Sequence, residues 1–387
     1  MNKKTLFKLH SWAGLICLVP FLLISFTGSL LVFKDEIDSV LLPEFTQVIA
    51  QGERLNSNTL IHNIKSQLPG YELGSWEILS GSEADRIYLI KHGTDEWYKA
   101  HLNPYTGKVL SQPVDLHHYL TDWLLQLHYT LLLNDLFEFD RDLGTAFTSI
   151  FAILLMFLGI SGLVIYRRFW ARVFTLRLDQ RLLALLSDVH KMIGTLSSPV
   201  LLILGLTGGY YNIAIYVHEW QEHSGGKEHY KVTQPLYNSA LDFDAMIKNK
   251  GNYIAGFETS YVVMPSEPNA PVVLYGRVPS HNILLSDYAS TISFNSVTGE
   301  LVNAYDIREQ SFVPVMVDTF RKLHFGNFAG LLSKVIWCVV GFMPILLGLS
   351  GGYLWYKRRG SKRRKIVKQK TLSAAKRANN PRFETSL

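Results

Sequence analysis

The sequence contains few charged residues for its length. Asp, Glu, Lys and Arg make up only 18% of the 387 residues, whereas hydrophobic residues make up 48%. This balance is too apolar for an ordinary soluble enzyme and too polar for a chain buried entirely in lipid. We therefore expect one part of the chain to span a bilayer and another part to fold in water.

Cysteine is also scarce, because Cys17 and Cys338 are the only two and both lie in apolar stretches. They exclude a disulfide framework and a cysteine metal cage. The C-x-x-C-H motif for covalent haem attachment is missing, so any haem would be of the b type. The G-x-G-x-x-G nucleotide-binding loop is missing as well. Although the net charge is +6, the basic clusters border apolar stretches, as membrane anchors do.

Four stretches are apolar over about 20 residues or more, the length that a helix needs to cross a bilayer. They cover residues 9–33, 143–166, 189–217 and 331–356. The first is too long for a signal peptide and lacks a small-residue cleavage site, so we expect it to be retained. The sequence thus predicts a four-helix transmembrane bundle.

Basic residues lie before the first stretch, between the second and third, and after the fourth. These residues are Lys3, Lys4, Lys8, Arg167, Arg168, Arg172, Arg177, Arg181, Lys357, Arg358, Arg359, Lys362, Arg363 and Arg364. The positive-inside rule then places both termini and the linker 169–188 in the cytoplasm. Segments 34–142 and 218–330 become extracytoplasmic, and the basic tail 360–387 is expected to be disordered.

The first and third stretches show an internal repeat. The same number of residues separates His10 from Thr27 and His190 from Thr207. The second and fourth stretches contain "LGISGLVIYRR" and "LGLSGGYLWYKRR", and the long segments share "LNPYTGKVL" (102–110) and "FNSVTGELV" (294–302). Each of the last two is predicted to form a strand, a Thr-Gly turn and a second strand. Residues 1–168 and 189–359 are therefore predicted to be parallel repeats, related by an axis along the membrane normal. Each would carry its own α+β domain.

Four of the 13 histidines occupy equivalent repeat positions. His10 and His190 fall at the cytoplasmic ends of outgoing helices, and His128 and His324 precede the returning helices on the outer side. Parallel repeats place equivalent residues at one depth. The sequence therefore predicts two histidine pairs in separate layers, which suits two haems with two axial histidines each.

Glycines follow the first pair on the same helix face, where they would leave room for a flat macrocycle. They are Gly14, Gly28, Gly194 and Gly208. Such glycines also serve simple close packing of membrane helices, and a membrane histidine is often only a hydrogen-bonded packing residue. Zinc or copper would lack ligands, since no carboxylate or cysteine recurs beside these histidines.

Other polar residues compete for a site. His117 and His118 are alternative ligands without a counterpart in the second half. His218, His223 and His229, with Glu219, Glu222 and Glu228, could bind a metal or substrate on a polar loop, although a solvated loop is the simpler interpretation. An acidic run, Asp135, Glu138, Asp140 and Asp142, could attract ferric iron or merely mark a solvated boundary.

These motifs resemble the PepSY-associated transmembrane family and, within it, the FoxB-type inner-membrane ferric-siderophore reductases. "LHSWAGL", "FTGSLLVFKDEID", "LNPYTGKVL" and "QLHYTLLL" carry the resemblance in the first half. "DVHKMIG", "GLTGGYYN", "SVTGELV" and "KLHFGNFAG" carry it in the second. It implies PepSY-like domains in the periplasm, two haems b, and electron flow across the bacterial inner membrane to a ferric substrate. Ser296-Val297 replace the Pro104-Tyr105 of the first motif, so the second domain departs from the first.

The resulting hypothesis is an oxidoreductase that reduces chelated iron(III), such as a ferric siderophore, for iron uptake. Its electrons would come from a separate cytoplasmic-side reductase or from quinol. The alternative is a non-catalytic sensory or regulatory PepSY protein in which the histidines only pack. A permease is disfavoured, because no charged residue lies in the middle of a span to couple ions. The sequence assigns no catalytic residue.

The topology can be tested with reporter fusions. A reporter that is active only outside the cytoplasm should work when inserted near Ser82 or Asn269 and should fail after Lys365, because the basic clusters fall on one side of the four stretches. Reporter activity at the C-terminus would contradict the scheme.

Overall fold

A computed structural model describes residues 2–134, 136, 142–166, 173–178, 181–224 and 230–378. Several residues singled out in the sequence lie outside these ranges: Asp135, Glu138, Asp140, Arg167, Arg168, Arg172, Glu228 and His229. The chain forms two compact units. The helical unit comprises Met1–Phe26, Phe147–Gly209 and Val339–Leu387, and the sheet unit comprises Thr27–Ala146 and Tyr210–Cys338.

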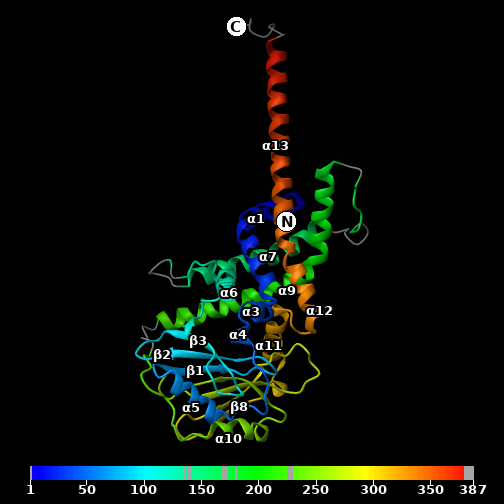
Figure 1. Cartoon of the computed structure of the whole chain (residues 1–387). Helices are drawn as coiled ribbons and strands as arrows, with labels where there is room; N and C mark the ends of the chain where they lie inside the picture. Colours follow the sequence, from blue (N-terminus) through cyan, green and yellow to red (C-terminus); the bar gives the residue numbers. More distant parts are fainter. Residues whose placement is uncertain are drawn as a thin grey trace. The chain divides into compact units, whose positions relative to one another are not determined.

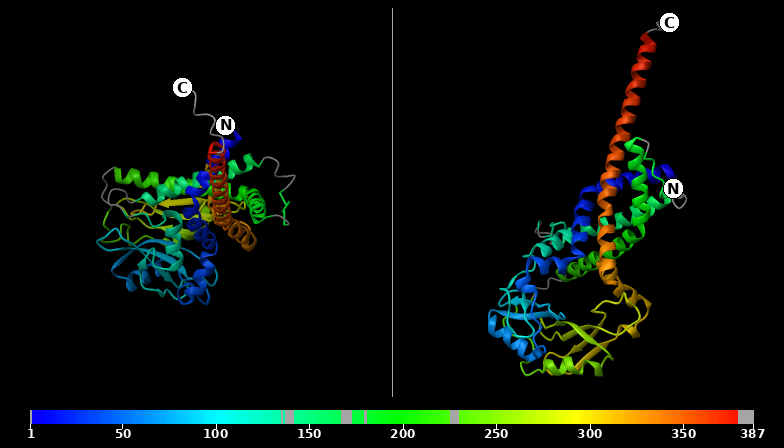
Figure 2. Two further views of the ribbon diagram at one scale, coloured as in Figure 1. Left: turned by 90° about the horizontal axis from the view of Figure 1, so that it is seen from above. Right: turned by 45° about the vertical axis from the view of Figure 1, so that its right-hand side comes forward.

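Three helical stretches in the described ranges are long and apolar enough to cross a membrane. They are α7 (Leu143–Ile165), Leu182–Gln221 within α9 (Leu182–Ser224), and Gly330–Gly360. The last comprises α12 (Gly330–Gly341) and the start of α13 (Met343–Ala378), the long helix that ends in red in Figure 2. α1 (Lys3–Ile16) and α2 (Leu18–Leu31) qualify as a fourth only when taken together.

The first predicted span is not one straight helix. α1 and α2 meet at Cys17 and are bent by 63°. Pro20 explains the break, because proline has no N–H to bond the carbonyl of Ile16 and its ring crowds that carbonyl. The backbone hydrogen bonds on either side of the break are still made: Cys17 N donates to Ala13 O, and Phe21 N donates to Cys17 O.

Two other sequence predictions are corrected by the length of the helices. α9 continues into the predicted polar loop and ends at Ser224, so His218 lies on a helix. The tail 360–387 was predicted to be disordered, yet α13 continues to Ala378. Its Lys, Arg, Gln, Leu and Ala residues are good helix formers, and no proline or glycine interrupts residues 361–378.

Small residues and aromatic rings make contacts between the helices of the helical unit. A β-carbon on Gly348 would lie 2.9 Å from Leu18, and one on Gly205 would lie 2.9 Å from Met156. The helices therefore approach closely where glycine leaves space, as in many membrane proteins. Edge-to-face ring pairs, Trp12–Trp355 and Phe21–Phe151, pack at centroid distances of 6.2 and 6.4 Å.

The sheet unit contains one antiparallel sheet of eight strands in the order β4-β3-β2-β1-β5-β6-β7-β8. Figure 1 labels four of these strands, β1, β2, β3 and β8. The strands are β1 (Tyr71–Glu77), β2 (Asp85–Lys91), β3 (Trp97–Leu102), β4 (Val114–Asp115), β5 (Glu258–Val263), β6 (Val272–Arg277), β7 (Ser290–Phe294) and β8 (Leu301–Tyr305). The predicted separate domains are thus joined in one sheet through β1 and β5, which pair Ser75 with Val263 and Glu77 with Tyr261. This pairing removes an open strand edge from each half.

A single hydrophobic core accompanies this sheet. Trp76 on β1 is 2% exposed and packs in the same cluster as Ile292 on β7, so both halves contribute to one core. Two helices, α5 (Ser57–Gln67) and α10 (Phe243–Lys248), pack together and add Leu60 and Phe243 to it. The Trp76 indole N–H also donates to the buried Asp85 carboxylate at 2.8 Å.

The two shared Thr-Gly motifs form turns of the same construction, as predicted. Gly107 N donates to Asn103 O and Gly299 N donates to Asn295 O, at 2.8 and 2.9 Å. Both glycines have a left-handed backbone, with φ of 71° and 77°, which a side chain would strain.

Two helices of the sheet unit carry predicted histidine ligands. α6 (Leu120–Thr130) bears His128 and ends at Leu131 with φ of 54°, whereas α11 (Phe312–Phe325) bears His324 and ends at Gly326 with φ of 70°. The short helices are α3 (Lys34–Leu41), α4 (Pro43–Thr46), η1 (Asn249–Asn252) and η2 (Ile307–Glu309).

The shared core predicts the effect of one core substitution. Trp76→Ala should lower the free energy of unfolding by about 3–5 kcal/mol, since it opens a cavity and removes one hydrogen-bond donor to buried Asp85. Denaturant titration followed by circular dichroism measures this loss. Val302→Ala on the exposed edge strand β8 should change stability by no more than about 0.5 kcal/mol. Equal effects of the two substitutions would contradict the assignment of the core.

Candidate functional site

The sheet unit brings His128 and His324 together. Their ring centroids lie 6.2 Å apart and the ring planes are inclined by 53°. His128 comes from the first half of the chain and His324 from the second, so one predicted pair consists of neighbouring side chains. Tyr211 packs edge-on against His324 at a centroid distance of 6.3 Å.

α2 supplies the surroundings of His128. The Thr27 hydroxyl lies 3.2 Å from His128 Nδ1. A β-carbon on Gly28 would lie only 2.5 Å from Cε1 of the same ring. The Thr27-Gly28 dipeptide therefore contacts the imidazole through a hydroxyl and through bare backbone. Gly28 was predicted to leave room for a macrocycle on the helix face of His10, whereas the structure places the His128 ring against it.

His324 is neutral at pH 7. Burial, followed by the nearby charge of His128, lowers its pKa to about 3. A neutral imidazole retains the lone pair that metal coordination requires.

In the helical unit, His10 and His190 each contact a serine on a returning helix. His10 Nδ1 on α1 lies 2.7 Å from the Ser161 hydroxyl on α7. His190 Nδ1 on α9 lies 2.9 Å from the Ser350 hydroxyl on α13. The two environments are built alike from the two halves of the chain.

Glycines also border these two histidines. A β-carbon on Gly162 would lie 3.5 Å from His10 Cε1, and one on Gly351 would lie 3.2 Å from His190 Cε1. The predicted haem-packing residues Gly14 and Gly194 face Leu158 at 3.9 Å and Leu347 at 3.6 Å, which are ordinary contacts. Gly208 lies in α9 beside Thr207, which is buried.

Imidazole nitrogens are among the axial ligands that haem iron takes in proteins. A metal that bonds one nitrogen of each imidazole at about 2 Å requires ring centroids roughly 6 Å apart, and the His128–His324 separation meets this requirement. At His10, His128 and His190 the hydroxyl contact engages Nδ1 and directs Nε2 elsewhere. Metal-bound histidines typically have their second nitrogen fixed in this way.

The described residues contain no group of three or more His, Cys, Asp or Glu side chains that could hold a metal ion. The proposed alternative ligands also lie in other settings. His118 is about half exposed, with its Nδ1 3.7 Å from Asp115, and His117 lines a polar pocket. His218 is exposed on α9.

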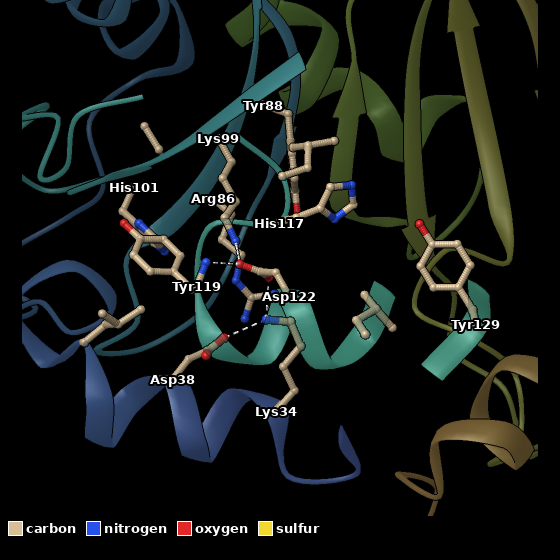
Figure 3. Close-up of a pocket in the computed structure, with 14 residues that line it drawn as sticks. Lys34, Asp38, Arg86, Tyr88, Lys99, His101, His117, Tyr119, Asp122 and Tyr129 are labelled. Carbon is tan, nitrogen blue, oxygen red and sulfur yellow. Dashed lines mark hydrogen bonds and ion pairs between the residues drawn. The ribbon is translucent and has the colours of Figure 1, made fainter. Parts of the chain in front are cut away.

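This polar pocket, of about 250 Å³, lies between α3, β2, β3 and α6 within the sheet unit (Figure 3). Lys34 Nζ donates to Thr121 at 2.7 Å and to Asp122 at 3.1 Å, and Lys99 also pairs with Asp122. Arg86 pairs with Asp35 and Glu77. Through its contacts with Lys34 on α3 and Lys99 on β3, the network fixes the first turn of α6, the helix that carries His128.

Burial changes the titration of two groups that line the pocket. It lowers the pKa of Lys99, although the Asp122 carboxylate opposes this shift. Burial and then the charge of Arg86 lower the pKa of His101 to about 4, so His101 is neutral at pH 7. Sequence analysis did not identify His101, because no motif or repeat distinguishes it.

Sequence analysis also missed Ser161 and Ser350 as partners of the histidines. Their signal was present, since both belong to the "LGISG" and "LGLSG" motifs of the second and fourth apolar stretches. A repeat between these motifs does not by itself show which of their residues face the histidines.

The chain is thus a membrane protein in which several apolar helices accompany an antiparallel sheet unit. The family model of the PepSY-associated TM region matches residues 7–358. The protein therefore belongs to the PepSY-associated transmembrane family, as its sequence motifs indicated. No curated protein matches the sequence.

The contact between Gly28 and His128 can be tested with two glycine substitutions. Gly28→Ala should lower stability by about 1–3 kcal/mol, because its methyl group overlaps the imidazole and displaces it. Gly14→Ala should be neutral or stabilising by up to about 1 kcal/mol, because its methyl group meets only Leu158 at 3.9 Å. Thermal unfolding of both variants in the same detergent distinguishes these outcomes. A tolerated Gly28→Ala would mean that the ring does not pack against α2.

Proposed function

We propose that this protein is a transmembrane di-haem oxidoreductase that passes electrons to ferric iron outside the cytoplasm. The observation that carries the proposal is the His128–His324 pair, whose 6.2 Å centroid separation suits two axial ligands of one iron. The hydroxyl contacts at His10 and His190 support a second haem held by that pair.

Bound haem supplies one-electron transfer, and two histidine ligands leave no open coordination position for oxygen. Reduction of chelated iron(III) to iron(II) takes one electron for each iron. A cytoplasmic-side reductase or membrane quinol supplies this electron. The substrate class is a ferric siderophore or another iron(III) chelate, and iron(II) is released for uptake.

The proposal includes the arrangement of the chain in the bacterial inner membrane. The two halves act as parallel repeats, with both termini in the cytoplasm and the sheet unit in the periplasm. Supporting this arrangement, His10–Ser161 and His190–Ser350 recur at matching positions of the two halves. Equivalent residues then share one depth, so His10 pairs with His190 on the inner side and His128 with His324 on the outer side.

The haem content provides the first test. Protein purified from haem-replete cells should contain about two haems b per chain, extractable into acidified solvent because no C-x-x-C-H motif can anchor them. His10→Ala or His190→Ala should remove one haem, and His128→Ala or His324→Ala should remove the other. Reduced-minus-oxidised spectra and haem extraction measure both effects.

His118→Ala is the matched control, because His118 is exposed and should leave both haems in place. A colourless, folded wild-type protein would contradict the proposal and favour a non-catalytic sensory or regulatory role. Loss of the same haem from His10→Ala and His128→Ala would contradict the pairing. Loss of the outer haem should also abolish reduction of an external ferric chelate while leaving the inner haem reducible.

A further inference from the structure

Hydrogen bonding determines which nitrogen of His190 carries the proton. The Ser350 hydroxyl has one proton, and it donates this proton to the Leu346 carbonyl on its own helix at 2.6 Å. The same oxygen lies 2.9 Å from His190 Nδ1. Since the hydroxyl makes its shorter contact with the Leu346 carbonyl, we assign the serine oxygen as the acceptor of a hydrogen bond from His190 Nδ1–H.

The same accounting applies to His10. The Ser161 hydroxyl donates to the Leu158 carbonyl at 3.3 Å and lies 2.7 Å from His10 Nδ1. Because the two serine–histidine pairs are built alike, we assign Ser161 as the acceptor of a hydrogen bond from His10 Nδ1–H as well.

A neutral imidazole carries one ring proton. With that proton on Nδ1, the lone pair of each histidine lies on Nε2. Gly162 and Gly351 allow the carbon edge of each ring to approach the helix backbone, at 3.5 and 3.2 Å from a notional β-carbon. A serine and the following glycine therefore determine both the tautomer and the placement of each ring.

We propose that Ser161 and Ser350 are positioning residues that prepare His10 and His190 to coordinate haem iron through Nε2. This inference rests on the proposed di-haem function. Neither serine contacts the iron; each acts through its histidine. The Ser-Gly pair of each returning helix becomes part of the cofactor site, a role that the four histidines alone do not reveal.

The hydroxyl also affects the electronic character of the ligand. A hydrogen bond from Nδ1–H to an acceptor makes Nε2 more basic. A more basic ligand favours ferric over ferrous iron, so the serines should hold the potential of the inner haem down. Removing a hydroxyl should raise that potential and weaken haem binding.

The test uses the full chain with Ser161→Ala or Ser350→Ala. The inner haem should bind at least about 10-fold more weakly in a haem titration, as expected when a hydrogen-bond partner of a metal ligand is removed. Its midpoint potential, measured by spectroelectrochemistry, should shift upward. Ser350→Thr keeps a hydroxyl and should restore both values towards the wild type.

Ser197→Ala provides a matched control. Ser197 is a buried serine on α9 that donates to the Ile193 carbonyl at 2.7 Å, as Ser350 does to Leu346. It should leave both the affinity and the potential unchanged. Nitrogen-15 spectra of histidine-labelled, haem-depleted protein should show loss of an Nδ1–H tautomer in Ser350→Ala and not in Ser197→Ala.

These outcomes separate two kinds of failure. If the wild type binds no haem, the proposed function is wrong and the serine inference falls with it. If the wild type binds two haems, but the Ser161 and Ser350 variants match Ser197→Ala in affinity, potential and tautomer signals, the serine inference alone is wrong.

Discussion

The antiparallel pairing of β1 with β5 is the constraint on which the sheet unit depends. It joins strands from residues 71–115 to strands from residues 258–305 in one sheet with one core. α6 follows the strands of the first half and α11 follows those of the second. A chain with two independent domains would leave the distance between these helices to a linker. The continuous sheet instead belongs to the same compact unit as His128 and His324, which contact each other from opposite halves of the sequence.

The histidines of the two units are held by different means. In the helical unit, serine hydroxyls that already bond their own helices contact His10 and His190. In the sheet unit, Thr27 and Gly28 contact His128 from α2, and the Lys34–Asp122–Lys99 network anchors the first turn of α6. A hydroxyl beside Nδ1 is the feature that His10, His128 and His190 share.

Sequence patterns predicted much of this architecture because apolar length, basic clusters and Thr-Gly turns are local signals. They located the apolar helices, the two turns and the motifs of the family. They did not predict the 63° bend, although Pro20 was visible, because the apolar pattern continues through it. They also did not predict the β1–β5 pairing, since strand partners far apart in sequence have no local signature. The haem assignment itself stays a prediction from histidine spacing, to which the structure adds contacts.

The ends of α6 and α11 give the two neighbouring histidines different mechanical settings. α11 ends at Gly326, which adopts its left-handed backbone without steric cost and packs under Trp337, whose indole donates to the Leu323 carbonyl. α6 ends with two leucines, Leu131 and Leu132, at φ of 54° and 57°. A left-handed backbone costs a residue with a side chain roughly 1–2 kcal/mol. The backbone just after His128 is therefore strained, whereas the backbone just after His324 is not.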